Sequence, residues 1–152
     1  MHSYLLYIFM INLPYELMDK IRRLTYNPKP INMLNQIKMR HQFKKQLYDV
    51  YTLLYSDELA SDPKAIENWI DNDITLCLNK EQPSMNGYTD HYYNILSRNI
   101  IFNTKEKIDR FSDICFTKID SKTTINIYLG LLNTSDILEL KKYIIKTYKQ
   151  YI

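Results

Sequence analysis

Apolar residues recur along this chain with the spacing of amphipathic α-helices. In the longest stretch, residues 31–55, the apolar positions share one side of a helical wheel: Phe43, Leu47, Val50, Tyr51 and Leu54. Capping residues and prolines predict further helices: Asp62-Pro63 to about Asn79, Thr89 or Asp90 to Arg98, Asn103 or Thr104 past Cys115, and Ser135 to Tyr151. The pattern predicts an all-α fold, a single-domain bundle of about six or seven helices.

Residues 122–132 fit two different patterns. Alternate residues from Thr123 to Leu131 suit a half-buried strand, whereas Ile125, Tyr128 and Leu132 form a helical stripe. The β-branched content favours a strand. However, no second strand is evident as a partner, and an unpaired strand leaves its backbone groups without hydrogen bonds. We expect a helix here, with a strand as the alternative.

Two charged residues fall within predicted apolar faces. Asp73 follows Ile66 by seven positions, and Arg40 lies on the same arc as Phe43 and Leu47. A buried charge without a partner is costly. The sequence therefore suggests a buried Arg40–Asp73 ion pair, with the alternative that each side chain extends to water.

The length and composition suit one domain, because 152 residues with 45% hydrophobic content can build a substantial core. We expect residues 1–11 to form an apolar N-terminal extension, with Met10 as a candidate natural start. Their apolar run is too short to span a bilayer, so no membrane partner is expected. Residues 56–152 should pack with the preceding helical region as one domain.

Residues that carry common active-site chemistry are sparse. The two glycines, Gly87 and Gly130, cannot build a phosphate-binding loop. The three histidines are scattered, and neither Cys77 nor Cys115 has a His or Cys at metal-ligand spacing. Both cysteines have apolar neighbours, which predicts free thiols in a reducing compartment. We expect a non-catalytic protein with no cofactor, metal or small-molecule substrate.

Positive charge is concentrated near the N-terminus. Residues 1–52 carry eight Lys and Arg against three Asp and Glu, whereas the whole chain has a net charge of +3. The basic cluster consists of Arg22, Arg23, Lys38, His41, Lys44 and Lys45. Such a cluster can bind nucleic-acid phosphates in a salt-sensitive way. No DNA-binding motif accompanies it, so a solvated face is the favoured interpretation.

The most informative segment is Leu-Pro-Tyr-Glu-Leu-Met-Asp-Lys-Ile-Arg-Arg-Leu, residues 13–24. Pro14 suits the first turn of a helix, and apolar residues follow at helical spacing. This segment resembles the first helix of the F-box, a small helical domain that docks on the Skp-type adaptor of ubiquitin ligases. The resemblance implies an F-box-like helical region over residues 12–55. It also implies that the residues that bind a protein partner are Leu13, Pro14, Leu17, Ile21 and Leu24.

Three other segments resemble uncharacterised proteins of giant DNA viruses: Thr25–Pro30, Met85–Tyr88 and Ile125–Leu132. This second resemblance implies a viral origin, a helical fold and a location in the host cytoplasm. The fourteen tyrosines are further support for a partner-binding surface. The predicted function is a protein-interaction protein, in its most concrete form an F-box-like adaptor. The alternatives are a virion structural protein that binds capsid proteins, as a minor capsid or cement protein does, and a basic nucleic-acid-associated protein.

Overall fold

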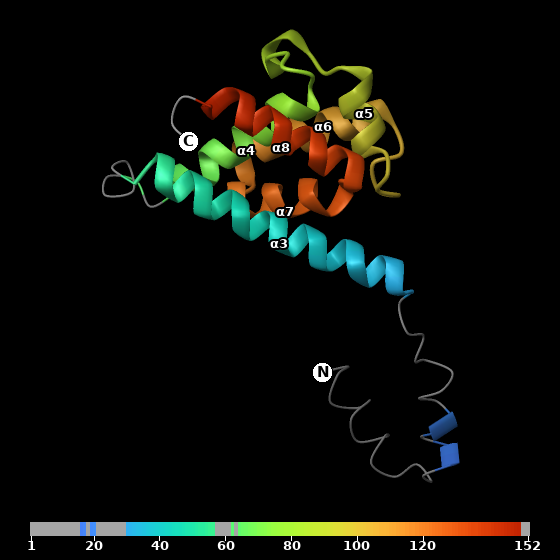
Figure 1. The fold of residues 1–152 in the computed structure, drawn as a ribbon. Helices are drawn as coiled ribbons and strands as arrows, with labels where there is room; N and C mark the ends of the chain where they lie inside the picture. The colour runs from blue at the N-terminus through green and yellow to red at the C-terminus, as the bar shows by residue number, and fades with distance from the viewer. Residues whose placement is uncertain (1–15, 18, 21–29, 57–61, 63, 150–152) are drawn as a thin grey trace. The chain divides into compact units, whose positions relative to one another are not determined.

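The computed structural model describes residues 16–17, 19–20, 30–56, 62 and 64–149. These residues form α-helices, one 3-10 turn and their connections, and no strand occurs among them (Figure 1). The predicted all-α fold is therefore confirmed. No helix in this described part of the chain is both long and apolar enough to cross a membrane.

The chain divides into two compact units, Met1–Asn35 and Gln36–Ile152. In the first unit, Glu16, Leu17, Asp19 and Lys20 are helical, and the start of α3 follows Pro30. The predicted extension, residues 1–11, lies outside the described residues.

The helices have the following bounds: α3 Ile31–Leu54, α4 Ala65–Leu78, α5 Asp90–Leu96, α6 Lys105–Lys118, α7 Ser121–Leu131 and α8 Thr134–Tyr148. The 3-10 turn η2 covers Ser84–Asn86. Residues 122–131 belong to helix α7. The expected helix in this segment is therefore confirmed, and the alternative of a strand is wrong. The side chains of Ile125, Tyr128 and Leu132 are buried, as the helical stripe predicts.

Side-chain caps define where most of these helices begin. Thr89, Thr104 and Asp120 each accept a hydrogen bond from the backbone N–H three residues further on. Ser135, which the sequence suggests as the cap of α8, lies inside that helix. Asn133 is the cap, and it forms a reciprocal capping box with Asp136.

Helix α4 starts two residues later than its Asp-Pro signal predicts. Its N-cap is Lys64, which makes no side-chain cap. Instead, the Asp62 carboxylate accepts from the backbone N–H of Lys64 at 2.9 Å, and its carbonyl accepts from Ala65. Asp62 therefore closes a turn that precedes the helix.

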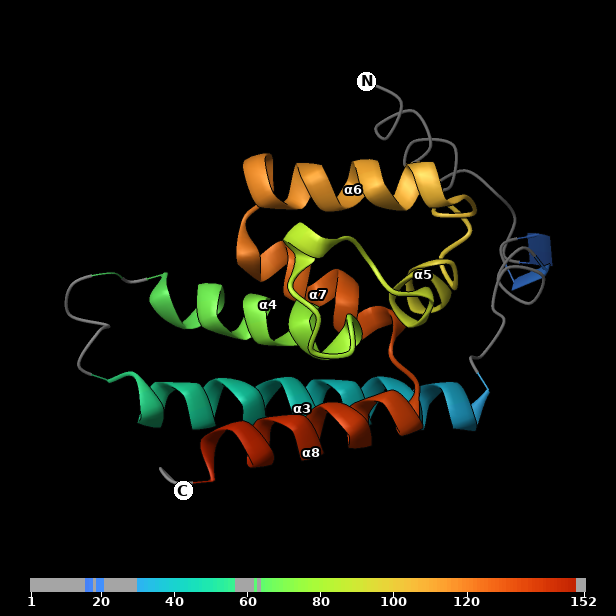
Figure 2. The same cartoon turned by 90° about the horizontal axis from the view of Figure 1, so that it is seen from above.

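Helix α4 has the central position in the second unit, since it packs against α5, α7 and α8. Figure 2 shows α4 and α7 between α6 on one side and α3 with α8 on the other. Tyrosines supply much of this core: Tyr51, Tyr92 and Tyr128 are fully buried. The Tyr92 hydroxyl lies 2.9 Å from both the Ser112 and Tyr128 hydroxyls, so the buried oxygens satisfy one another.

A buried carboxylate joins three of the helices. Asp73 of α4 is 5% exposed. Its Oδ2 accepts hydrogen bonds from the hydroxyls of Tyr51 on α3 at 2.5 Å and Tyr148 on α8 at 2.6 Å. The Tyr55 hydroxyl donates to that of Tyr148 at 3.0 Å, and the Tyr55 ring stacks on Trp69. We use the name Asp73 cluster for Asp73, Tyr51, Tyr55 and Tyr148.

The suggested Arg40–Asp73 pair is wrong, although the burial of Asp73 is confirmed. Arg40 donates from Nε to the backbone carbonyl of Leu132 at 2.9 Å. It thereby satisfies a carbonyl just after α7 that has no partner within that helix. The donors to Asp73 are tyrosine hydroxyls instead. Burial of Tyr51 raises its pKa far above the usual range, and the hydrogen bond to Asp73 and the charge of Asp73 raise it further.

Tyr51→Phe should destabilise the protein by about 1.5–3 kcal/mol, because it removes a buried hydrogen bond to a charged acceptor. Urea denaturation followed by circular dichroism measures the change. Tyr93→Phe is the matched control, since the Tyr93 hydroxyl donates to Asp109 at 2.6 Å in a half-buried place. It should cost less than about 1 kcal/mol. Equal losses for the two variants would contradict a special role of Asp73.

Candidate functional site

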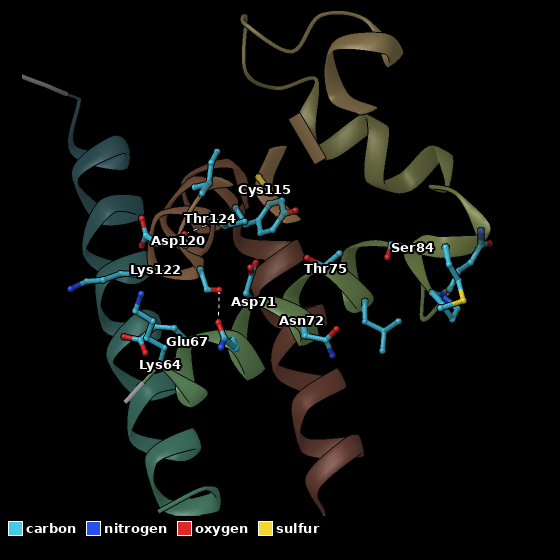
Figure 3. A pocket seen from close by; sticks show the side chains of 18 residues that line it. Lys64, Glu67, Asp71, Asn72, Thr75, Ser84, Cys115, Asp120, Lys122 and Thr124 are labelled. Atoms are coloured by element: carbon cyan, nitrogen blue, oxygen red, sulfur yellow. Dashed lines mark hydrogen bonds between the residues drawn. The ribbon is translucent and has the colours of Figure 1, made fainter. Parts of the chain in front are cut away.

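A cleft of about 790 Å³ lies between α4 and the α6–α7 corner in the second unit (Figure 3). We call it the α4 cleft. Its α4 side is polar and consists of Glu67, Asn68, Asp71, Asn72 and Thr75, with the apolar Leu76 at one end. The opposite side is built from Cys115, Ile119, Asp120, Ser121, Lys122, Thr124 and Tyr128. The segment Gln82–Met85 closes the Leu76 end, and Lys64 lies at the other.

The segment at the Leu76 end is held by one buried amide. Asn79 donates from Nδ2 to the carbonyls of Gln82 at 2.7 Å and Gly87 at 3.0 Å. Its Oδ1 accepts from the backbone N–H of Thr89 at 2.7 Å. Gly87 has φ +87°, a conformation that disfavours other residues. This end of the cleft is therefore a defined wall.

At the other end, α4 and α7 are joined directly. The Ser121 hydroxyl donates to Asn68 Oδ1 at 2.8 Å, across the start of α7. Asp120, the N-cap of α7, accepts from the backbone and hydroxyl of Thr123, which lowers its pKa. These contacts fix the width of the cleft near Asp71.

Asp71 is the unusual group of the α4 cleft. The residue is half-buried, and its Oδ1 is inaccessible to water and has no hydrogen-bond partner. Burial raises the pKa of the Asp71 carboxyl to about 6, and the polar Ser121 side chain nearby opposes that rise. At neutral pH the cleft therefore contains a carboxylate whose charge the fold leaves largely uncompensated.

The cysteines are not activated. Burial raises the pKa of Cys115, beside the cleft, to about 11, and that of Cys77 to about 12. Both thiols are free, as predicted, and are protonated at neutral pH. Among the described residues, no group of His, Cys, Asp and Glu is arranged to hold a metal ion.

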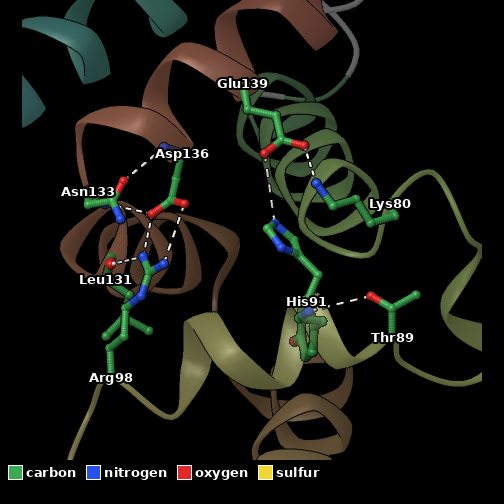
Figure 4. Close-up of polar contacts among 9 residues, drawn as sticks. Lys80, Thr89, His91, Arg98, Leu131, Asn133, Asp136 and Glu139 are labelled. Atoms are coloured by element: carbon green, nitrogen blue, oxygen red, sulfur yellow. Dashed lines mark hydrogen bonds and ion pairs between the residues drawn. The ribbon is translucent and has the colours of Figure 1, made fainter.

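A second polar group lies around the start of α8 (Figure 4). Arg98 forms an ion pair with Asp136, which is 8% exposed, and donates to the carbonyl of Leu131 at 3.1 Å. Burial alone would raise the pKa of Asp136, but Arg98 and the Asn133 backbone outweigh burial and lower it. Asp136 accepts from Arg98 and from the backbone N–H of Asn133, so this group joins α5 to the start of α8.

Of the five predicted partner-binding residues, the structure describes one, Leu17. Leu13, Pro14, Ile21 and Leu24 lie outside the described residues. Leu17 is helical and 48% exposed.

The predicted basic cluster is partly described. Lys38, His41 and Lys45 are exposed on α3, at spacings that place them on one face. Lys44 is half-buried and donates to Asn126 of α7 at 2.6 Å, so it is engaged within the fold. Arg22 and Arg23 lie outside the described residues.

The sequence analysis missed Asp71. A signal was present: Glu67, Asp71 and Thr75 recur every four residues, with Asn68 and Asn72 beside them. Such a stripe is normally a solvated helix face. Only the packing of α6 and α7 beside it turns the stripe into one side of a cleft.

Comparisons with protein-family models, with curated proteins and with solved structures found no match to this chain.

Two Asp→Asn substitutions should change stability in opposite directions. The raised pKa of Asp71 means that the folded state binds its proton more tightly than the unfolded state, so ionised Asp71 destabilises the fold above about pH 6. Asp71→Asn should stabilise the protein by about 1–2 kcal/mol at pH 7.5, a value reduced for solvent screening. This gain should shrink as the pH falls toward 4.

Asp136 has a lowered pKa, so its contribution is present at neutral pH and is lost as the pH falls through its folded-state pKa. Asp136→Asn should cost about 1–3 kcal/mol at pH 7.5. Chemical denaturation of both variants between pH 4 and 7.5 makes the comparison. A loss of stability on Asp71→Asn at pH 7.5 would contradict the account of the α4 cleft.

Proposed function

We propose that this chain is a non-catalytic protein-interaction protein that holds an extended segment of its partner in the α4 cleft. The observation that carries the proposal is the Asp71 carboxylate, which is half-buried in an open cleft and forms no ion pair within the described residues. A carboxylate in a cleft whose pKa burial raises is a candidate for a functional site.

The dimensions of the cleft suit a peptide segment. Its α4 side runs from Glu67 to Leu76, which is about 14 Å of helix at 1.5 Å per residue. An extended chain covers that distance with about four residues. Polar groups line the middle, and Leu76 with Met85 supplies apolar surface at one end. Met85 is 90% exposed, and exposed methionines adapt well to the side chains of a partner.

The cleft does not favour catalysis. Its thiol, Cys115, has a raised pKa and therefore little thiolate at neutral pH. Among the described residues that line the cleft there is no histidine, and Asp71 changes its charge near pH 6. A half-buried carboxylate beside a protonated thiol suits recognition better than bond cleavage.

The exposed Leu17 favours a second candidate, the F-box-like adaptor. In that function the N-terminal helix, with Leu17 on its surface, would dock on a Skp-type adaptor in the host cytoplasm. The α4 cleft would then hold the protein that is delivered to the ligase. The two candidates are compatible, since the residues involved belong to different units.

Selection of random heptapeptides on immobilised protein tests whether the cleft binds a segment. We expect enriched peptides that bind the native chain and lose most of their affinity for Asn72→Trp, because the indole fills the cleft from an exposed position on α4. Leu17→Asp is the matched control, and it should leave peptide binding unchanged. Failure to enrich any peptide, or equal binding to Asn72→Trp, would overturn the proposed function.

A further inference from the structure

We infer that the segment bound in the α4 cleft presents a lysine or arginine side chain to Asp71. This inference rests on the proposed function and names the chemistry that the cleft selects. A cationic group is the occupant that compensates a carboxylate charge in a partly desolvated place, where the attraction is stronger than in water.

The charges around Asp71 support a cation. On its own helix, Glu67 adds a second carboxylate to the same side of the cleft, and Cys115 of α6 is a neutral thiol at neutral pH. Within the described residues, no lysine, arginine or histidine forms an ion pair with Asp71. The α4 side of the cleft therefore carries two carboxylates, Glu67 and Asp71, and no basic residue between them.

Two lysines also line the cleft, and both are exposed. Lys64 lies near enough to Asp120 for its charge to help lower the pKa of that carboxyl. Lys122 extends from the first turn of α7. Their exposure lets water screen them, whereas Asp71 is half-buried and screened less. The shape of the cleft also suits long basic side chains, since Leu76 and Met85 can pack against a methylene stem while the charged end reaches a carboxylate.

Titration by nuclear magnetic resonance tests the inference with defined probes. The first probe is acetyl-Gly-Ala-Lys-Ala-Gly-amide, and the others replace its lysine with arginine, norleucine or glutamate. At pH 7.5 we expect the lysine and arginine peptides to shift α4 and α7 amide signals, with at least ten-fold weaker binding for norleucine and glutamate. Asp71→Asn should remove that preference, whereas Asp49→Asn, which changes an exposed carboxylate on α3, should preserve it.

The outcomes separate this inference from the proposed function. Equal binding of the norleucine and lysine peptides would overturn the inference and leave segment binding intact. Free n-butylammonium tests whether the cleft binds a small amine as well as a peptide. If it binds at Asp71 as tightly as the lysine peptide does, the inference of cation binding is supported and the proposal that the cleft binds a peptide segment is overturned. If neither the amine nor any peptide shifts the α4 signals, both proposals are overturned.

Acidification gives an independent readout. Because the pKa of Asp71 is about 6, lowering the pH from 7.5 to 5 protonates most of it in the free protein. The affinity for the lysine peptide should then fall about ten-fold, while that for the norleucine peptide should not change. The charged or titratable groups on the facing side of the cleft are Cys115, Asp120, Lys122 and Tyr128. The raised pKa values of Cys115 and Tyr128 keep both neutral over this range, and the lowered pKa of Asp120 keeps it ionised. A pH-independent affinity for the lysine peptide would contradict the assignment of Asp71.

Discussion

The second unit depends on one buried carboxylate. Asp73 accepts hydroxyls from Tyr51 and Tyr148, so a single oxygen holds α3, α4 and α8 together although their residues are far apart in the sequence. A charge in this position is tolerated only with strong donors, because its removal from water is costly. This contact adds to the apolar face of α4, where Ile66, Ile70 and Ile74 are buried in the core. Helix α4 packs against α5, α7 and α8.

Two aspartates on α4 show how one helix serves two purposes. Asp71 and Asp73 are two residues apart, which places them about 200° apart around the helix. Asp73 therefore points into the Asp73 cluster, while Asp71 borders the α4 cleft. The first accepts two buried tyrosine hydroxyls that stabilise the fold, and the second has an unpartnered oxygen and opposes it. Such a local loss of stability is often found where a protein binds something else.

The sequence was sufficient for much of the fold, because helices depend on local signals. The apolar stripe of α3 and the threonine caps of α5 and α6 follow from spacing and capping. The helical nature of α7 follows from the lack of a partner strand, because its spacing fits a strand as well as a helix. The start of α8 was misplaced because Asn133 and Ser135 are both good caps, and only the reciprocal bond with Asp136 decides between them.

Partners of side chains were harder to predict than helices. Burial of Asp73 follows from its place on an apolar face, but its tyrosine donors come from helices whose packing the sequence does not reveal. Arg40 illustrates the same limit, since its acceptor is a backbone carbonyl after α7 rather than a carboxylate. The α4 cleft arises from the same tertiary packing, so a polar helix stripe containing Asp71 could not be distinguished from an ordinary solvated face.

The ionisation of Asp71 is the most direct test of this account. The pKa of its carboxyl group can be measured from the carbon-13 chemical shift of the side chain as the pH is varied. The account predicts a value of about 6, well above the usual 3.8, in the protein without a ligand. A value below 4 would show that the carboxylate is already compensated within the fold, and the case for the α4 cleft as a binding site would fail.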